Sequence, residues 1–473
     1  MTEKELSMTP KVTVVARTVE APIEGIVKNE VKFDTDSMRN EAIILSGKAA
    51  GICYMPDDYL SNGIQNDKTA KKRAAGNTKS GHYSVFEHAH FSFVVETSKA
   101  MAMVLNSTKL YSTSEKSGRY TSMNPETEIE KKYYDKWTEK IAGIIKDTYG
   151  ESYTDKEAHK LALENARYFL SVFTPTVMMF TVPFSRIILI CEWLDNLANT
   201  IDEMIYKQII RSSEKTKYNY FTRLSKEAVE LSDAFRESLG LSAEEPILVD
   251  HKDIGIKFFE PIYEYEREAF ICGCLHNYRC NNISYGKYRN DISNDMYSLY
   301  NTYSFACLAQ EQRHRTIDYS IVNIMEESFY TPAILTKEED IVEWKSDMKD
   351  MYLHSNVVPQ ATMCFVHESG SFDNFYLKCK ERVCMRAQKE IMDITVEQIK
   401  FIYKETSTNI NNNVFLDLSP LNAARLYSMI EKFGEDGVLC KDPLVLPRCM
   451  WRGYKCKEVC THVKHDCTES RRI

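Results

Sequence analysis

The sequence predicts a mixed fold of the α/β (α+β) class, arranged as two tandem domains that each hold a small sheet and long helices. Three observations lead to this prediction. The 473 residues exceed one typical domain and suit two or three. Helical periodicity dominates, but segments with the two-residue alternation of strands interrupt it. Near residues 239–253, Gly240 and Pro246 end a helical charge pattern, and a new apolar run begins.

Strand and helix patterns follow one another in the first half. Residues 11–18 alternate as a strand, and Ser37 can cap a helix that runs through Ala49. Residues 90–96 alternate strictly between apolar and polar side chains, which predicts a half-buried strand leading into a helix over 99–109. Further helices are expected over 128–146, 154–173 and 187–239. A basic segment, expected to be a solvated loop, contains Lys68, Lys71, Lys72, Arg73 and Lys79.

The second half repeats this order more loosely. Helical patterns cover residues 297–312 and 382–404, and a polar break at 409–413 separates a C-terminal appendage. We therefore expect two tandem domains followed by an extension, with the boundaries 1–242, 243–408 and 409–473.

Composition narrows the class of protein and its partners. A net charge of -8 argues against nucleic acid, which requires a basic face. No apolar run approaches the roughly 20 residues of a membrane span, and the polar start of the chain does not resemble a signal peptide. The 14 cysteines are too sparse for a secreted disulfide scaffold. We expect a cytoplasmic protein with reduced thiols that binds neither nucleic acid nor membrane.

Cysteine is concentrated near the C-terminus. Cys449, Cys456, Cys460 and Cys467, together with His462, are ligand types that suit tetrahedral zinc. Their spacing fits no paired Cys-x2-Cys scheme, so the sequence leaves open whether this tail binds a metal.

The segment Arg313-His314-Arg315 concentrates cationic donors at the end of an apolar helix. Gln310 lies one turn earlier on the same face. A fixed cluster of such donors stabilises negative charge on a bound group. Taken alone, the segment could equally be a solvated basic helix end.

The segment Ser117-Gly118-Arg119-Tyr120, preceded by Glu115, has the chemistry of a phosphate site. A hydroxyl, a glycine amide and a guanidinium in succession can present several donors to one phosphate. Gly118 also allows the backbone to approach a ligand closely. The alternative is an ordinary Glu115–Arg119 ion pair on an exposed helix.

Two further segments carry polar side chains that could contact a ligand. Residues 82–88, with Ser84 among them, stand at the entrance of the predicted strand, where they could also simply satisfy one another. Asn374 and Arg382 precede the run Ala387-Gln388-Lys389-Glu390. A guanidinium stays charged and can stabilise an enolate-like anion, although ordinary Arg–Glu surface pairing is the alternative.

Together, these segments resemble the flavin-dependent thymidylate synthase family. Family members carry Arg-His-Arg and Ser-Gly-Arg-Tyr close together, whereas here they lie apart, at 313–315 and 117–120. In the first half, Ser107-Thr108-Lys109 stands where Arg-His-Arg would be expected. In the second half, no Ser-Gly-Arg-Tyr follows Arg-His-Arg, and residues 321–325 lack the expected motif residues. Asp195 stands where the first half should have its uracil-polarising Arg. A duplicated chain whose halves have divided one site is the most economical interpretation.

The resemblance implies an enzyme that uses FAD and NADPH to transfer a methylene from methylenetetrahydrofolate to C5 of dUMP and reduce it, giving dTMP. A reduced flavin carries negative charge near N1 and C2=O, which the Arg-His-Arg segment would stabilise. The implied flavin contacts are Ser84, Glu115, Arg313, His314, Arg315 and Asn374. The implied nucleotide contacts are Gln310, Ser117, Gly118, Arg119 and Arg382, with Arg382 as the catalytic residue that polarises uracil.

The resemblance also implies an assembly. Single-domain relatives form homotetramers, so a chain with two family-like domains is expected to form a homodimer with two working flavin sites. Some viral members of the family end in a similar Cys-rich tail. If this protein is viral, it is expected in the host cytoplasm. Two alternatives stay open: a flavin- and folate-dependent deoxypyrimidine hydroxymethylase, and a non-catalytic scaffold that binds flavin or nucleotide.

Overall fold

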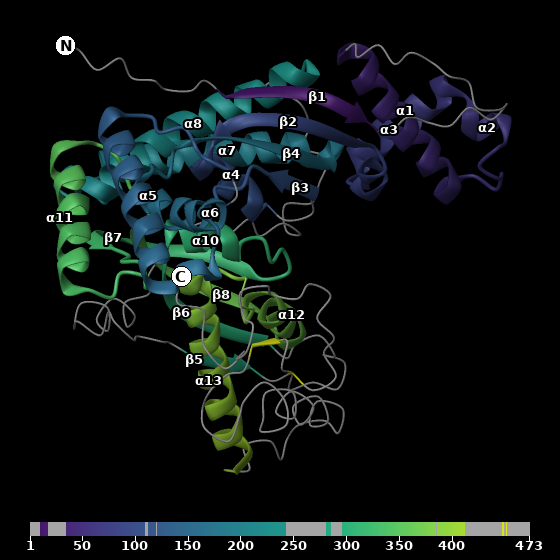
Figure 1. The fold of residues 1–473 in the computed structure, drawn as a ribbon. Helices are drawn as coiled ribbons and strands as arrows, with labels where there is room; N and C mark the ends of the chain where they lie inside the picture. Colours follow the sequence, from purple (N-terminus) through teal and green to yellow (C-terminus); the bar gives the residue numbers. More distant parts are fainter. Residues whose placement is uncertain are drawn as a thin grey trace. The chain divides into compact units, whose positions relative to one another are not determined.

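The computed structural model confirms the α+β class, since helices pack on two four-stranded antiparallel sheets (Figure 1). Contacts divide the chain into two compact units, residues 1–117 with 173–256 and residues 118–172 with 257–473. These units follow packing and differ from the division at residue 242, so the domain boundaries stay a prediction. The structure describes residues 10–17, 35–108, 112–119, 121–242, 281–284, 296–384, 386–411, 447–448 and 451.

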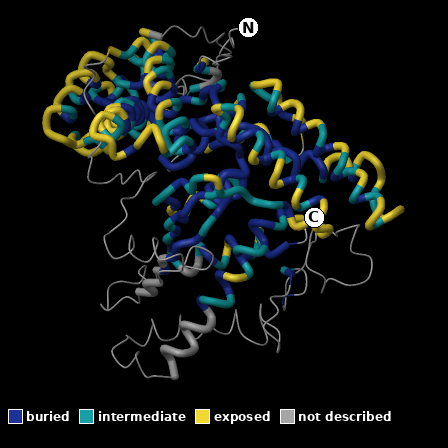
Figure 2. Tube along the Cα trace, turned by 90° about the vertical axis from the view of Figure 1, so that its left-hand side faces the viewer, coloured by how far each residue is buried: buried dark blue, intermediate teal, exposed yellow. Residues whose placement is uncertain are grey.

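The sheet of the first unit has the strand order β1-β2-β4-β3. Its strands are β1 (Lys11–Arg17), β2 (His90–Ser98), β3 (Ser112–Glu115) and β4 (Pro175–Pro183). The alternation along β2 is confirmed, because Phe91, Phe93 and Val95 are buried. On β4, Val177 and Met179 face the other way and are exposed. Burial along the chain can be followed in Figure 2.

Three long elements pack on the buried face of this sheet: α4 (Lys99–Ser107), α7 (Phe184–Tyr206) and α8 (Lys215–Leu239). The ring of Phe235 on α8 meets those of Phe93 and Phe180, with centroid separations of 5.4 and 6.2 Å. The single helix predicted over 187–239 is therefore wrong. The chain leaves the helical path between α7 and α8, where Gln208 has a φ of 58°, outside the right-handed helical region.

Before β2 come three helices and a short 3-10 turn: α1 (Thr35–Tyr54), α2 (Asn62–Gln65), α3 (Asp67–Ser80) and η1 (Tyr83–Glu87). The basic segment is thus helix α3 and not the expected loop. Gly81 ends it in the left-handed conformation, with a φ of 76°. Arg73 is half-buried and donates to the backbone carbonyls of Gly47 and Ile64 at 2.8 Å, so its guanidinium is held by the fold.

The sheet of the second unit has the order β5-β6-β8-β7, which repeats the order of the first sheet. Its strands are β5 (Asn281–Ser284), β6 (Met296–Ser304), β7 (Asp318–Phe329) and β8 (Thr362–Ser371). The helix predicted over 297–312 is wrong, because this stretch is strand β6 followed by helix α10 (Phe305–Glu311). Tyr297, Leu299 and Tyr303 are buried on β6, and a short aromatic run of this kind fits either structure.

The helical elements of the second unit come from both halves of the sequence. They are α5 (Glu128–Tyr149), η2 (Gly150–Ser152), α6 (Asp155–Ala166), η3 (Arg167–Phe169), α11 (Glu338–His354), α12 (Phe372–Arg382) and α13 (Lys389–Asn411). Trp137 on α5 meets Trp344 on α11 at 4.9 Å between ring centroids, and Phe169 packs against both. The helix predicted from Arg382 begins only at Lys389, since Arg382 ends α12.

Three predictions concern chain termini, metals and membranes. The Cys-rich tail lies outside the described residues, apart from Trp451 and the pair at 447–448. Within the described ranges, no group of three or more His, Cys, Asp and Glu side chains is placed to hold a metal ion. None of the helices described is long and apolar enough to cross a membrane.

Candidate active site

The Arg-His-Arg segment lies in the turn between α10 and β7 of the second unit. Ser304 caps α10, since its hydroxyl accepts a hydrogen bond from the backbone N–H of Cys307 at 3.0 Å. The helix ends at Glu311, and the following turn exposes the side chains of Arg313 and Arg315. Two guanidinium groups are therefore presented to solvent at the end of a buried helix.

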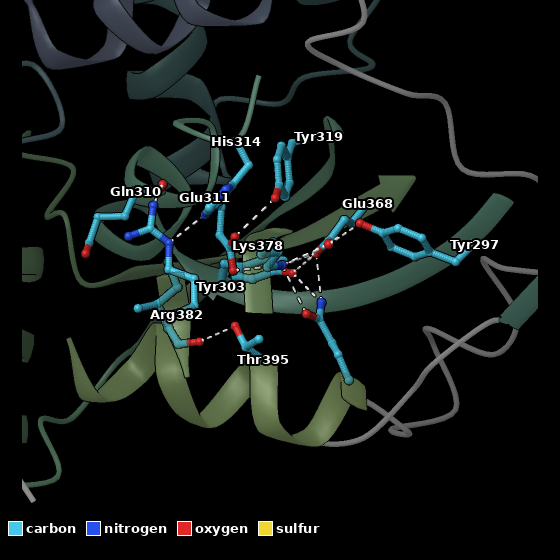
Figure 3. A network of polar contacts seen from close by, with 12 residues as sticks. Tyr297, Tyr303, Gln310, Glu311, His314, Tyr319, Glu368, Lys378, Arg382 and Thr395 are labelled. Carbon is cyan, nitrogen blue, oxygen red and sulfur yellow. Dashed lines mark hydrogen bonds and ion pairs between the residues drawn. The ribbon is translucent and has the colours of Figure 1, made fainter. Parts of the chain in front are cut away.

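Arg382, at the C-terminal end of α12, contacts this turn directly (Figure 3). Its Nε donates to Nε2 of His314 at 2.7 Å, and its Nη2 donates to the backbone carbonyl of Gln310 at 2.9 Å. Both acceptors are uncharged. No carboxylate forms an ion pair with Arg382 within the described part of the chain, and Glu311, whose carboxylate feels the Arg382 charge, pairs with Lys378.

His314 is a neutral acceptor and not the third cation that the sequence suggested. Burial, together with the nearby charges of Arg382 and Lys378, lowers the pKa of His314 to about 2. Because Nε2 accepts from Arg382, the ring proton belongs on Nδ1. The segment thus carries two positive charges at any physiological pH.

Asn374 stands at the other end of the same turn. Its backbone N–H is capped by the Ser371 hydroxyl at 3.3 Å, and its side-chain Nδ2 donates to the carbonyl of Thr316 at 3.1 Å. The structure therefore brings Asn374, Arg382 and the Arg-His-Arg turn together, while their roles toward a flavin or nucleotide stay predictions.

Gln388 joins this region to the segment 118–172. Its Oε1 accepts from Arg167 Nη2 at 2.5 Å and from Gln310 Nε2, and its Nε2 donates to the Tyr168 hydroxyl at 2.5 Å. Gln310 Oε1 is buried and has no hydrogen-bond partner among the described residues. A buried acceptor of this kind is costly unless a ligand or water supplies a donor.

Gly118 and Arg119 belong to the second unit, on the turn that follows β3. Gly118 is buried, and a Cβ there would lie 3.4 Å from Met123 Cγ and 3.8 Å from Arg167 Cδ. Arg119 Nε lies 3.1 Å from Glu164 Oε1, and its Nη2 donates to the carbonyl of Arg386 at 2.7 Å. The alternative of a helical Glu115–Arg119 pair is therefore wrong.

Arg167 lies in a run, residues 166–170, that resembles a helix of the family, but the sequence assigned it no role. It is almost fully buried next to Arg119, and burial is the main cause that lowers its pKa below the usual value. Its Nε has no hydrogen-bond partner among the described residues. The signal was present in the run Ala166-Arg167-Tyr168-Phe169-Leu170, but an Arg within an apolar run gives no indication of what it faces.

The remaining predicted residues lie in the first unit. Ser84 is exposed on η1, and Ser117 directly precedes Gly118. Glu115 ends β3 and pairs with Lys99, whose Nζ is 2.6 Å from its carboxylate. Asp195, which replaces the uracil-polarising Arg of the first half, pairs with Arg236 at 2.5 Å. The first unit therefore lacks a guanidinium at this place on α7 and holds a neutralised acid instead.

Comparison with known proteins finds one family model that is similar to part of this chain. Residues 36–194 match the family model "Thymidylate synthase complementing protein". The match confirms the resemblance to the flavin-dependent thymidylate synthases over about a third of the chain, including Ser84 and the segment 115–119. A comparison with curated proteins gave no match.

Similar solved structures include two of flavin-dependent thymidylate synthase ThyX from Helicobacter pylori with FAD and dUMP. One is 14% identical, with 51% of this chain and 98% of that chain covered and a TM-score of 0.26. The other is 15% identical, with 48% and 99% covered and a TM-score of 0.23. The UMP/dUMP methylase PolB from Streptomyces cacaoi, bound with 5-Br dUMP, is 15% identical, with 38% and 75% covered and a TM-score of 0.24.

Proposed function

We propose that this protein methylates dUMP at C5 to give dTMP, using FAD, NADPH and methylenetetrahydrofolate. One observation carries the proposal. The segments 118–119 and 310–315, far apart in sequence, lie in one compact unit. Both bond to one short stretch of chain, since Arg119 donates to the carbonyl of Arg386 and Gln310 donates to Gln388. The family match over residues 36–194 supports the same function.

Arg119 and Arg167 would hold the nucleotide phosphate. The carboxylate of Glu164 pairs with Arg119, and the Nε of buried Arg167 has no hydrogen-bond partner among the described residues. Two neighbouring guanidinium groups can present several donors to one phosphate. Gly118 leaves the turn without a side chain beside them.

Arg382 would polarise the uracil ring. Its charge is oriented by two neutral acceptors, His314 and the Gln310 carbonyl, and is therefore available to an anion that develops on the substrate. Gln310 Oε1, buried without a donor, would accept a hydrogen bond from the same ligand.

The flavin would lie against the turn that carries Arg313 and Arg315, with Asn374 at its far end. Two exposed guanidinium groups fit the negative charge of a reduced isoalloxazine. A bound reduced flavin supplies the hydride that completes the new methyl group. Ser84 and Glu115 are proposed as further flavin contacts from the first unit.

We infer that the chain arose by tandem duplication. The two sheets share one strand order, and each places a Ser-capped helix after its second strand. The first copy keeps Ser-Gly-Arg and the second keeps Arg-His-Arg. We propose a homodimer of such chains in the cytoplasm, or in a host cytoplasm if the source is viral, with one working flavin site per chain.

The test is bound FAD per chain together with product analysis. The proposal predicts one FAD per chain, and dTMP from dUMP when methylenetetrahydrofolate and NADPH are supplied. A hydroxymethylated product, from dUMP or dCMP, would instead show the alternative hydroxymethylase. A purified protein that is colourless and cannot be reconstituted with FAD would refute both enzymes and favour the non-catalytic scaffold.

A further inference from the structure

Helix α12 holds the Arg-His-Arg turn at three points. Asn374, Lys378 and Arg382 are spaced four residues apart and so share one face of the helix. Each of the three contacts the segment 310–316. Asn374 donates to the carbonyl of Thr316, and Lys378 Nζ lies 3.0 Å from Glu311. Arg382 donates to His314 and to the Gln310 carbonyl. The central contact differs from the outer two, because it is an ion pair with no exposed surface (Figure 3).

Lys378 is the centre of a fully buried cluster. Its Nζ lies 2.8 and 2.9 Å from the two carboxylate oxygens of Glu368 on β8, and it donates to Gln398 Oε1 on α13 at 3.0 Å. The side chains of Lys378, Glu311 and Glu368 are all 0% exposed. One ammonium group thus connects α12 to α10, β8 and α13.

The two carboxylates have different surroundings. Glu368 accepts from the hydroxyls of Tyr297 and Tyr303 at 2.7 and 2.5 Å and from Gln398 Nε2 at 2.7 Å. Glu311 has Lys378 and the Tyr319 hydroxyl, the latter at 3.1 Å. The pair Lys378–Glu368 is therefore complete by itself, and Glu311 is an additional carboxylate attached on the side of the turn.

We propose that Lys378, acting through Glu311, is a positioning residue that sets Arg382 relative to the Arg-His-Arg turn. Ion pairs buried without exposure fix geometry, although an apolar set of the same volume can stabilise a fold equally well. Here the fixed geometry joins the helix that carries Arg382 to the turn that carries Arg313 and Arg315. This inference rests on the proposed function, which assigns these arginines to one site.

The test compares Glu311→Gln, Lys378→Met and the double variant that combines them. Glu311→Gln leaves the complete Lys378–Glu368 pair, so we expect it to fold with an unchanged Tm. Lys378→Met leaves two buried carboxylates without a cation, and we expect its Tm to fall. The double variant still leaves Glu368 buried without a cation, although this carboxylate keeps its donors Tyr297, Tyr303 and Gln398. We expect its Tm to recover in part, to a value between those of Lys378→Met and wild type.

A positioning role predicts that activity does not recover with the Tm. Relative to wild type, the double variant should lose about tenfold to hundredfold in kcat or in kcat/KM for dUMP. The kcat or kcat/KM of Glu311→Gln for dUMP should also fall. Lys380→Met, on the same helix and outside the cluster, is the matched control. Wild-type kinetics in Glu311→Gln and the double variant would overturn the proposal.

A second readout does not depend on turnover. Amide hydrogen exchange over residues 310–316 should be faster in Glu311→Gln and in the double variant. Exchange over 389–399 should stay unchanged in Glu311→Gln, because this variant keeps the hydrogen bond of Lys378 to Gln398. Equal exchange over 310–316 in wild type and both variants would overturn the positioning role. A failure of the proposed function would appear differently, as a wild-type protein that binds no FAD or makes no dTMP.

Discussion

At the scale of single residues, the structure explains how a strong positive charge is kept available. Arg382 is held by a neutral imidazole and a carbonyl, and His314 stays neutral because two cations and burial disfavour its protonation. The sequence indicated Arg382, Asn374 and the Arg-His-Arg segment through the family resemblance. It gave no role to Arg167 and did not indicate Lys378, because the contacts of both residues are to partners that are distant in sequence.

Substitution of Arg382 by Lys tests the fork geometry of this guanidinium. A single ammonium group cannot donate both to His314 Nε2 and to the Gln310 carbonyl along the same directions while facing a substrate. We expect kcat to fall by roughly 100-fold, in line with the loss of one oriented charge donor, with FAD still bound. Steady-state kinetics with dUMP measure the effect, and the exposed Arg211→Lys is the control. A variant with wild-type kcat would contradict the assignment.

The neutrality of His314 predicts a specific dependence of stability on pH. The folded pKa is about 2, below the unfolded value of 6.5, so the unfolded chain takes up the proton first as the pH falls. His314 therefore destabilises the folded state below pH 6.5, with a slope that approaches about 1.4 kcal/mol per pH unit.

His314→Gln replaces the imidazole by an uncharged acceptor for Arg382. As the pH is lowered from 6.5 to 5, we expect the free energy of unfolding to fall less in this variant than in wild type. The exposed His159→Gln is the control. Urea unfolding at several pH values measures the difference. Parallel curves for His314→Gln and wild type would show that the imidazole is protonated in the folded state.

At the scale of elements, periodicity predicted β1, β2 with its buried face, and the helices α1, α4, α5 and α6 of the first half, but not β3, β4 or α3. It failed where two structures share one pattern. Tyr303, Cys307 and Gln310 have helical spacing, yet Tyr303 belongs to β6 and only the other two to α10. The break between α7 and α8 contains neither Gly nor Pro, so no residue type marked it.

The matching starts of α4 and α10 give a prediction for these elements. Ser98 and Ser304 are buried caps that accept from the backbone N–H of Met101 and Cys307, and each hydroxyl also donates to a buried carboxylate. We expect Ser98→Ala and Ser304→Ala to lower the free energy of unfolding by about 1–3 kcal/mol each. Denaturant titration provides the measurement, and exposed Ser212→Ala should change little. A loss below 0.5 kcal/mol at both caps, roughly the level of an ordinary surface substitution, would contradict this account.

At the scale of the whole molecule, sequence and packing divide the chain differently. The motifs divide it near residue 242, whereas contacts place residues 118–172 in the same unit as residues 257–473. As a result, Arg119 and the Arg-His-Arg turn lie in the same compact unit of one chain. No periodicity could have predicted it, because it depends on the tertiary contacts of α5 and α6, such as that between Trp137 and Trp344.

The most direct test of the divided site is subunit complementation between Arg119→Ala and Arg313→Ala. Each substitution alone should abolish dTMP formation. Because both residues belong to the second unit of the same chain, every site in a mixed dimer lacks one of them, and we predict that co-expressed variants stay inactive. Recovery of dTMP formation in the mixture would mean that Arg119 of one chain serves Arg313 of another, and would contradict the account.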